Sequence, residues 1–314
     1  MATDTIQNIT IIGTGLIGAS IGLALRAHGF SGRITGWDRD PEELQVALAH
    51  GAVDRMADAP LAAAQASDLI VLATPVFGIL DWMEQLAPLL QPGQLVTDVG
   101  STKQRICERA TTLFNHRTTA AFLAGHPMAG KEVYGAAHAE AQLFHGAVWL
   151  FSCAPEKTKG PATEASLQMK GRIETRVEGR IVEGRIQEWR AWVQRFGCRV
   201  VDVDPVRHDE LCAWASHLPQ MVGTALAALL EDEFGSTENL RDELRDVGGR
   251  ALREMTRLGA SPFSMWRDVA QSNSERIAAT LLALEQRLAL LRENLKQPEL
   301  RAEFERANRF RQHF

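Results

Sequence analysis

Residues 9–18 read Ile-Thr-Ile-Ile-Gly-Thr-Gly-Leu-Ile-Gly, an apolar run that leads directly into Gly13-x-Gly15-x-x-Gly18. This spacing after a strand pattern is the turn that binds the pyrophosphate of a dinucleotide. The first glycine permits a tight turn, the second lets the backbone approach the phosphates, and the third lets the next helix pack closely. A helical pattern opens at Leu16, so free N–H groups and the positive end of a helix dipole would face the anion. The stretch predicts a Rossmann-type fold.

A second apolar run ends in Asp38, 20 residues after Gly18. A carboxylate there accepts hydrogen bonds from the adenosine ribose and repels a 2′-phosphate, so it favours NAD over NADP. Arg39 could hold a 2′-phosphate instead, and a glycine turn beside a solvated aspartate is the simpler alternative. The predicted cofactor contacts are Gly13, Gly15, Leu16, Ile17, Gly18, Asp38, Thr74, Pro75 and Ser101.

The composition limits the class of protein. The chain has 314 residues, enough for two domains, and 45% of them are hydrophobic. A net charge of −5 and the lack of a long basic tract argue against a nucleic-acid partner. No apolar run approaches the ~20 residues that span a bilayer, and the N-terminus lacks the features of a secretory signal. We therefore expect a cytoplasmic protein with no membrane partner.

The four cysteines are scattered along the chain and form no CxxC pair. This usage is typical of a reducing cytosol. It predicts neither a disulfide framework nor a bound metal.

The first half of the chain alternates short apolar runs with helical patterns, as βαβ units do. Strands are predicted at 9–12, 33–38, 68–73, 94–98, 121–124, 148–151 and 199–203. Crossovers of this length imply parallel strands. The pattern predicts an α/β Rossmann domain with a doubly wound, mostly parallel sheet over residues 1–204.

From about residue 205, long helical patterns replace the strands. They cover 208–234, 238–258, 262–283 and a charged segment to about 297. Apolar residues in the first of them recur at i, i+3, i+4 and i+7. We therefore predict an all-helical domain for substrate binding and dimerisation over residues 205–314. The Ala- and Leu-rich helices favour a homodimer, and a monomeric helical cap is the alternative.

Residues 156–186 interrupt the strand and helix pattern. Charges and glycines dominate, and Gly-Arg-Ile recurs as an imperfect repeat. We expect a solvated, mobile insertion, because the segment holds few residues that could form a core. A partner-binding arm is the alternative.

Two polar clusters follow predicted strands: Asp-Val-Gly-Ser101-Thr-Lys103 and Gly-His126-Pro-Met-Ala-Gly-Lys-Glu132. Ligands of open α/β sheets bind at the carboxyl ends of strands, which favours Ser101 and Lys103 near the nicotinamide. The pKa of a histidine lies near neutral pH, so His126 is suited to act as a general base. Glu132 could orient it or shape the pocket. The alternatives are an N-capping serine and a structural histidine.

A third cluster lies in the predicted helices. His217 comes just before Pro219, which should kink the helix. Arg253 and Arg257 are four residues apart, so they share a helix face. Two guanidinium groups on an Ala/Leu/Met helix indicate a carboxylate site. A pair of solvated arginines is the alternative, because acidic residues lie nearby.

Together these segments resemble the prephenate/arogenate dehydrogenase family of tyrosine biosynthesis. The resemblance covers nearly the whole chain, in the segments GTGLIGAS, DLIVLATPV, DVGSTK, GHPMAG-KE, SHLPQ and TRL…SPFSMWRD. It implies that His126 hydrogen-bonds the ring hydroxyl of the substrate and that Ser101 positions this histidine and the nicotinamide. It also implies that His217 and Arg257 hold the substrate's carboxylates, with Trp266 nearby.

The resemblance extends to further residues. It implies that Glu132 sits at the mouth of the site. Arg253 falls where many relatives have a lysine that reaches in from the partner subunit, and Arg and Lys are not interchangeable. The pair His208-Asp209 matches a polar pair of the family that we take as structural. The insertion at 156–186 is longer than the family implies, and the chain is expected to end in a short charged tail without a mutase or regulatory domain.

The implied reaction is the NAD-dependent oxidative decarboxylation of prephenate to 4-hydroxyphenylpyruvate, with no metal. His126 would take the proton of the ring hydroxyl while hydride passes to the nicotinamide. The same chemistry on arogenate, giving tyrosine, is the first alternative. A β-hydroxyacid dehydrogenase is the second, although such enzymes usually place a lysine on the interdomain helix. A non-catalytic NAD(H)-sensing protein is a third.

Overall fold

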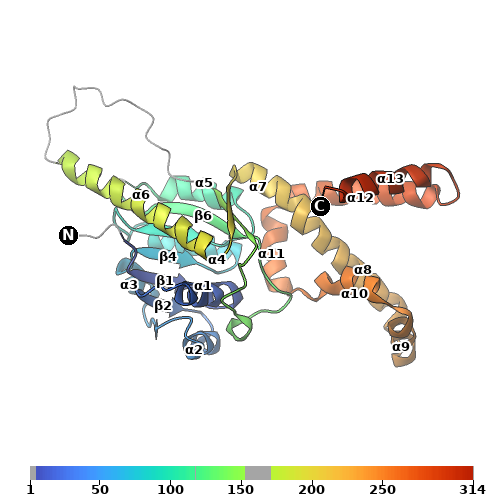
Figure 1. Ribbon diagram of the computed structural model, residues 1–314, viewed down its shortest axis with the longest axis horizontal. Coiled ribbons are helices and arrows are strands. Elements are labelled where there is room, and N and C mark those ends of the chain that lie inside the picture. Colours follow the sequence, from blue (N-terminus) through green and yellow to red (C-terminus); the bar gives the residue numbers. More distant parts are fainter. Residues whose placement is uncertain (1–4, 117, 153–170, 314) are drawn as a thin grey trace, which may run out of the picture.

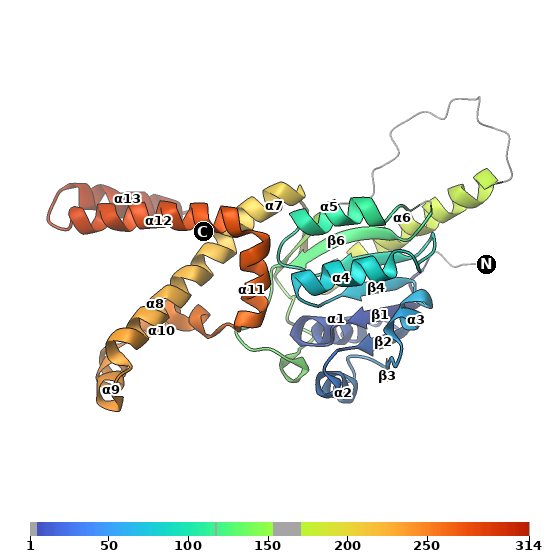
Figure 2. The same cartoon turned by 180° about the vertical axis from the view of Figure 1, so that it is seen from behind.

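The computed structural model describes residues 5–116, 118–152 and 171–313, with side chains from residue 180 onward in the last range. An eight-stranded sheet covered by helices forms one half of the molecule. The remaining helices extend from it as an elongated second half (Figure 1 and, from behind, Figure 2). The predicted fold class, an α/β Rossmann half followed by helices, is confirmed.

The strands lie in the order β3-β2-β1-β4-β5-β6-β7-β8. Their bounds are β1 (Asn8–Ile12), β2 (Arg33–Trp37), β3 (Arg55–Met56), β4 (Leu69–Leu72), β5 (Leu95–Asp98), β6 (Ala121–Pro127), β7 (Val148–Ser152) and β8 (Arg199–Asp202). The order reverses between β1 and β4, so a crevice for ligands is expected at the carboxyl ends of these two strands. The residues that follow β1, β4 and β5 all reach this edge.

The expectation of parallel strands is wrong for one pair, because β6 and β7 are antiparallel. Residues 128–147, which the structure describes throughout, contain a short 3-10 turn (Ala136–His138) and no crossover helix. Antiparallel strands need no crossover, so the chain can return directly. The β7 and β8 strands are parallel, and α6 (Gly171–Arg195) lies in the connection between them.

Helices cover both faces of the sheet because alternate residues of each strand point to opposite sides. In β4, Leu69 and Val71 join the core that contains residues of α1, α2 and α6, whereas Ile70 and Leu72 join the core that contains residues of α3, α4 and α5. The bounds of these helices are α1 (Leu16–Ala27), α2 (Pro41–Ala49), α3 (Pro60–Gln65), α4 (Val76–Leu86) and α5 (Gln104–Leu113).

The prediction of a mobile insertion at 156–186 is wrong for the part that the structure describes, because α6 already begins at Gly171. Its buried side chains are Ile181, Val182, Arg185, Ile186, Trp189, Trp192 and Val193. Their helical spacing forms one apolar stripe against the sheet, which the charges of the repeat obscure in the sequence. Arg185 donates to the Asp68 carboxylate and the Gly93 carbonyl, so its buried charge is paired. Residues 153–170 lie outside the described residues.

The helical half begins directly after β8. Its elements are α7 (Pro205–Cys212), a π-helical turn (Ala213–His217), α8 (Leu218–Phe234), α9 (Glu238–Val247), α10 (Arg250–Thr256), a 3-10 turn (Arg257–Ala260), α11 (Phe263–Ser272), α12 (Ser274–Glu293) and α13 (Glu299–Arg311). The predicted helix at 238–258 breaks at Gly248 and Gly249, and the one at 262–283 breaks at Asn273.

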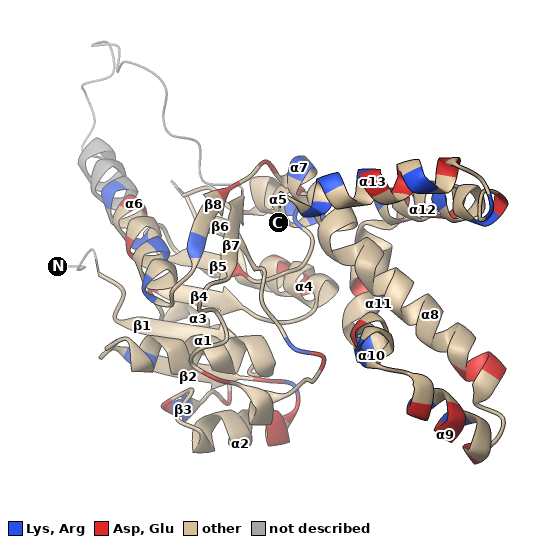
Figure 3. Ribbon diagram, turned by 45° about the vertical axis from the view of Figure 1, so that its right-hand side comes forward, with Lys and Arg blue, Asp and Glu red and all other residues tan. Residues whose placement is uncertain are grey.

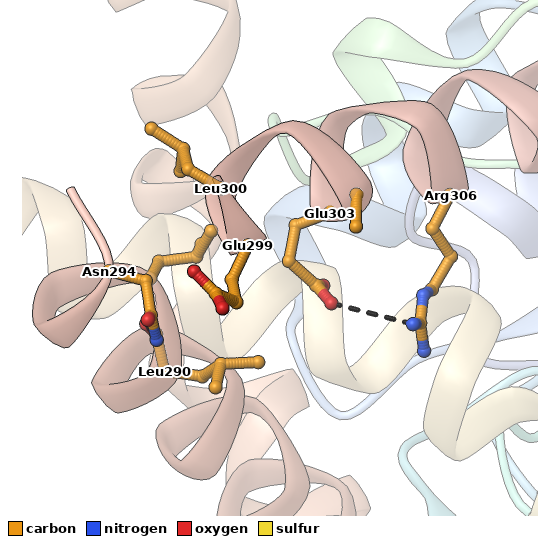
Figure 4. A pocket seen from close by; sticks show the side chains of 8 residues that line it. Leu290, Asn294, Glu299, Leu300, Glu303 and Arg306 are labelled. Atoms are coloured by element: carbon orange, nitrogen blue, oxygen red, sulfur yellow. Dashed lines mark hydrogen bonds and ion pairs between the residues drawn. The ribbon is translucent and has the colours of Figure 1, made fainter. Parts of the chain in front are cut away.

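The prediction of a short charged tail is wrong, because residues 299–311 form α13. This helix lies beside α12 in both views (Figures 1 and 2), and Arg287 of α12 pairs with Glu303 of α13 at 2.7 Å. Both charge signs alternate along this hairpin, whereas α8 is almost free of charge until its end (Figure 3). A cavity of about 220 Å³ lies between the two helices and is lined only by their residues and the loop between them (Figure 4).

The described residues bear on two further expectations. None of their helices combines the length and the apolar character needed to cross a membrane. Cys198 and Cys212 are free thiols, as predicted, but Cys107 is disulfide-bonded. The sequence positions of cysteines say nothing about which of them meet in the fold, so their scattered spacing did not reveal this bond.

Candidate active site

The glycine turn has the geometry that its sequence predicts. Gly13 has a φ of +95°, a backbone conformation that residues other than glycine rarely adopt. A Cβ at Gly18 would collide with the Gly13 carbonyl oxygen, which confirms that this position lets α1 pack closely. A Cβ at Gly15 would meet no atom within 4 Å, so this turn faces open space. No side chain caps the first turn of α1, and its amides are therefore available to an anion.

Two polar side chains, Asp38 and Thr74, lie close to the glycine turn. Asp38 accepts hydrogen bonds from the backbone amides of Thr14 (2.6 Å) and Asp40 (3.0 Å), so its carboxylate is fixed beside the glycine turn. Arg39 next to it is exposed. The hydroxyl oxygen of Thr74, just past β4, is buried and has no hydrogen-bond partner among the described residues. The methyl group of Thr74 faces Gly13, whereas its hydroxyl lies toward Gly78 of α4.

A fully buried ion pair holds the end of β6. The ammonium of Lys103 pairs with Asp98 and donates to the Gly125 carbonyl at 2.8 Å. The other oxygen of Asp98 accepts from the Gly125 amide at 3.1 Å. Burial lowers the pKa of Lys103, against the opposing effect of Asp98. Lys103 therefore fixes the residue before His126 and does not face the crevice, contrary to the prediction that placed it near the nicotinamide.

His126 lies near the carboxyl end of β6 with 8% of its surface exposed. Its Nδ1 is 2.8 Å from Nε2 of His208 on α7, and Nδ1 of His208 is 2.8 Å from Oδ1 of Asp209. Within the described part of the chain, the side chain of His126 has this hydrogen bond to His208 and no hydrogen bond to Ser101. Ser101 is partly buried on the loop after β5.

Asp209 joins the two halves of the molecule. Its Oδ1 accepts from the backbone amide of Lys103 at 2.7 Å, and its Oδ2 accepts from that of Gln104 at 3.0 Å. Burial alone would raise the pKa of Asp209, but hydrogen bonds from His208 and from these two amides outweigh it and lower the pKa. The carboxylate is therefore ionised at neutral pH.

The histidines are neutral at the same pH. The pKa of His126 lies well below its usual value, because of burial first and then of the nearby His208, Lys103 and His217. Burial also lowers the pKa of His208, although Asp209 opposes the shift. Neutral imidazole is the form that can accept a proton.

His217 is placed by the π-helical turn that precedes Pro219. Single π turns inside α-helices often occur at functional sites. The Nδ2 group of Asn273 donates to the Asp209 carbonyl at 2.9 Å and lies 3.2 Å from Nδ1 of His217. His217 must therefore accept at Nδ1 and carry its proton on Nε2. Burial lowers the pKa of His217 to about 4.

Of the other predicted substrate residues, Trp266, Arg257 and Arg253 lie on the helical half and Glu132 lies on the sheet half. The Trp266 ring is 5.9 Å from that of His217, nearly at a right angle, and its buried Nε1 has no partner among the described residues. Arg257 forms an ion pair with Glu132 from the loop after β6. Arg253 is exposed, and the structure gives it no ion pair within the described chain. The fold thus brings Arg257 and Glu132 together and leaves Arg253 apart.

Two hydrogen bonds near this region join the sheet half to the helical half. The carboxylate of Asp268 on α11 accepts from the Phe77 amide at the start of α4, at 3.1 Å. The hydroxyls of Thr102 and Ser272 are 2.8 Å apart. These bonds hold α11 against the sheet half, which sets the position of Trp266 relative to His126.

Models of two domains of one protein family match the chain: "Prephenate dehydrogenase, nucleotide-binding domain" over residues 21–177 and "Prephenate dehydrogenase, dimerization domain" over residues 204–310. The chain belongs to the prephenate dehydrogenase family. The resemblance drawn from the sequence is thereby confirmed. One model covers most of the sheet half, and the other covers the helices.

Individual members agree with this assignment. The chain is 30% identical to the prephenate dehydrogenase of Bacillus subtilis (strain 168) over 272 residues, which is 86% of this chain and 65% of the relative. It thus spans just under two thirds of that relative's length. Among solved structures, the prephenate dehydrogenase of A. aeolicus, in complex with hydroxyphenyl propionate and NAD+, matches with a TM-score of 0.79 and 25% identity, over 98% of each chain. The Synechocystis arogenate dehydrogenase matches with a TM-score of 0.69 and 28% identity, over 98% of this chain and 99% of that one.

Proposed function

We propose that this protein catalyses the oxidative decarboxylation of prephenate to 4-hydroxyphenylpyruvate with NAD⁺. The observation that carries the proposal is the buried, neutral imidazole of His126 at the carboxyl end of β6, on the sheet edge that also carries the glycine turn. The names of the relatives and the NAD+ complex of the A. aeolicus enzyme support it.

The residues of the first half suit NAD⁺. The α1 amides and the open space at Gly15 suit its pyrophosphate. The Asp38 carboxylate suits the two hydroxyls of the adenosine ribose and disfavours a 2′-phosphate. Thr74 and the partly buried Ser101 lie on the loops after β4 and β5, toward the nicotinamide end. When bound, NAD⁺ supplies the acceptor for the hydride that leaves C4 of the substrate ring.

His126 would accept the proton of the ring hydroxyl. As hydride leaves C4, the hydroxyl O–H bond breaks and the imidazole takes that proton, so a C=O bond forms at C4. Loss of the ring carboxylate as CO₂ then returns an electron pair to the ring, and the C4 oxygen takes back a proton as a phenol. No net proton is released. Aromatisation drives this second step, so the chain needs mainly to aim the hydride and to hold two carboxylates.

His217 and Arg257 would hold those carboxylates. His217 presents an N–H donor on Nε2 and stays neutral, whereas Arg257 presents a guanidinium fork that suits a carboxylate. The ion pair between Arg257 and Glu132 would have to open to admit the substrate. Trp266 adds a ring beside His217 and a free indole N–H.

The test is a set of steady-state rates with prephenate and with arogenate, each with NAD⁺ and with NADP⁺. We expect turnover of prephenate with NAD⁺, and loss of most of kcat in His126→Asn while NAD⁺ binding, measured by calorimetry, is kept. Unchanged kcat in this variant would remove His126 from the mechanism. Faster turnover of arogenate would assign the chain to the activity named for the Synechocystis relative.

We further propose a homodimer through the helical half. The α8 helix is rich in Ala and Leu, yet Gln220 and Gly223 are its only fully buried residues, and Leu229 is 56% exposed. A helix of this composition requires a partner surface. Arg253, which has no ion pair within the described chain, would then be free to reach the partner's site. Light scattering after size-exclusion chromatography should give twice the chain mass of 34.6 kDa, and a single-chain mass would refute the dimer.

A further inference from the structure

We propose that the pair His208-Asp209 fixes the tautomer of His126, so that Nε2 of His126 carries the lone pair that accepts the substrate's proton. The inference rests on the proposed function and adds two positioning residues to it. Its basis is the unbroken chain of hydrogen bonds from His126 through His208 to Asp209. The sequence alone indicated only a structural pair at these positions.

The direction of each hydrogen bond follows from Asp209. An ionised carboxylate can only accept. Three donors converge on it: the amides of Lys103 and Gln104, and Nδ1 of His208. Nδ1 of His208 must therefore carry the proton of this neutral imidazole, and Nε2 of His208 must carry its lone pair.

The tautomer of His208 determines that of His126. Two ring nitrogens 2.8 Å apart form a hydrogen bond only if one of them is protonated. Because Nε2 of His208 is the acceptor, Nδ1 of His126 is the donor. Nε2 of His126 is then unprotonated and free to act as a base. The opposite tautomer of His126 would place two lone pairs against each other in a buried site, which is costly.

One other group contacts the acceptor nitrogen. The Cys212 thiol lies 3.6 Å from Nε2 of His208, and burial raises its pKa to about 12, so it keeps its proton. A thiol is a weak donor and does not displace the imidazole N–H. The other charged or titratable groups that affect this cluster are Lys103, Asp98 and His217. None of them is placed to accept from Nδ1 of His126 in the described structure.

The arrangement also favours the proton transfer itself. When Nε2 of His126 takes the substrate proton, the imidazole becomes a cation whose Nδ1–H still donates to His208. The ionised Asp209 beyond it stabilises that positive charge through the intervening ring. No proton has to leave His208 or Asp209. The pair orients and stabilises the base, as the third member of a catalytic triad does.

The direct test reads the tautomer of His126 without any substrate. Selective ¹⁵N-histidine labelling and NMR at about pH 8 distinguish a protonated from an unprotonated ring nitrogen, and a His126→Asn sample assigns the signals. We expect the wild-type protein to show a proton on Nδ1 and none on Nε2. A proton on Nε2 of His126 would overturn the inference, whatever the kinetics.

Variants add a functional readout. His208→Leu removes the acceptor and should lower kcat about 100-fold, within the range that a positioned general base contributes, with little change in the KM for NAD⁺. His208→Gln keeps a carbonyl that can accept from Nδ1 of His126 and should recover at least about a tenth of the wild-type kcat. Cys212→Ala is the matched control, since it removes the other neighbour of the same nitrogen and should leave kcat within about twofold.

The outcomes separate the two proposals. Wild-type kcat in His208→Leu, with a folded spectrum, would overturn the positioning role while leaving the proposed function intact. If the wild-type protein turns over neither prephenate nor arogenate, the proposed function fails, and the NMR tautomer still decides whether His208 fixes His126. Should His208→Leu not fold, the wild-type NMR result and His208→Gln decide the question.

Discussion

The lowered pKa of His217 should reduce the free energy of unfolding at acid pH, by an amount that follows from the size of the shift. Its pKa is lowered from 6.5 to about 4 in the folded chain. Between those values the unfolded chain binds a proton at this site and the folded chain does not, so stability falls as pH falls. Each pH unit within this interval costs about 1.4 kcal/mol. Lowering the pH from about 7.5 to 5 should therefore cost about 2 kcal/mol through His217 alone.

The assay is urea unfolding at both pH values for the wild-type protein and for His217→Asn. Other buried histidines contribute to both proteins, so the comparison uses the difference in acid destabilisation between them. The variant should lose about 2 kcal/mol less than the wild type on acidification. His50→Asn, at an exposed position after α2, is the control and should behave as the wild type does. Equal acid destabilisation in wild type and His217→Asn would refute the neutral, buried state of this imidazole.

Four further substitutions test other parts of the structure. Gly15→Ala should keep the thermal stability of the fold but weaken NAD⁺ binding, whereas Gly18→Ala should lower the melting temperature because its Cβ meets the turn backbone; equal melting temperatures for the two would contradict this packing. Lys103→Met leaves the buried Asp98 carboxylate without its cation, and urea unfolding should show a loss of about 3–5 kcal/mol; a loss below about 1 kcal/mol would mean that the pair is dispensable. Arg257→Ala should chiefly raise the KM for prephenate, by roughly 10- to 100-fold for a lost charge-assisted bond; a wild-type KM would exclude the carboxylate clamp.

Much of the fold follows from local patterns in the sequence. The run of residues 69–72 is apolar at every position because both faces of β4 are covered, and the glycine turn follows β1 as expected. The antiparallel β7 was not predictable in this way, because a strand reads the same in either direction. The turn Ala136–His138 in place of a crossover helix decides its direction, and its sequence carries no strong signal.

The α6 helix shows a different limit. The charged residues and glycines that dominate residues 156–186 predict a solvated segment, although one face of it is apolar. The buried positions Ile181, Val182 and Ile186 recur at helical spacing, and this weaker signal was present. Local composition could not reveal that Arg185 would meet Asp68, which lies more than a hundred positions earlier in the chain.

The sequence predicted several residues of the candidate site but not which of them contact each other. His126, His217 and Arg257 could be selected because each follows a strand or lies on a distinctive helix. The pairing of His126 with His208 depends on how β6 meets α7, and no local pattern encodes that meeting. The buried role of Lys103 was missed for a different reason: its partner Asp98 is only five residues away, but the sequence does not show that the turn after β5 brings the two side chains together.

The dual attachment of Asp209 has a consequence for how this protein could be divided. Its carboxylate accepts from the amides at the start of α5, and the adjacent His208 on α7 contacts His126. A fragment ending before Pro205 would retain the nucleotide turn, yet its imidazole would be free to rotate and to exchange its proton between both nitrogens. Nucleotide binding would then be a property of this fragment alone, whereas catalysis would require both halves of the molecule.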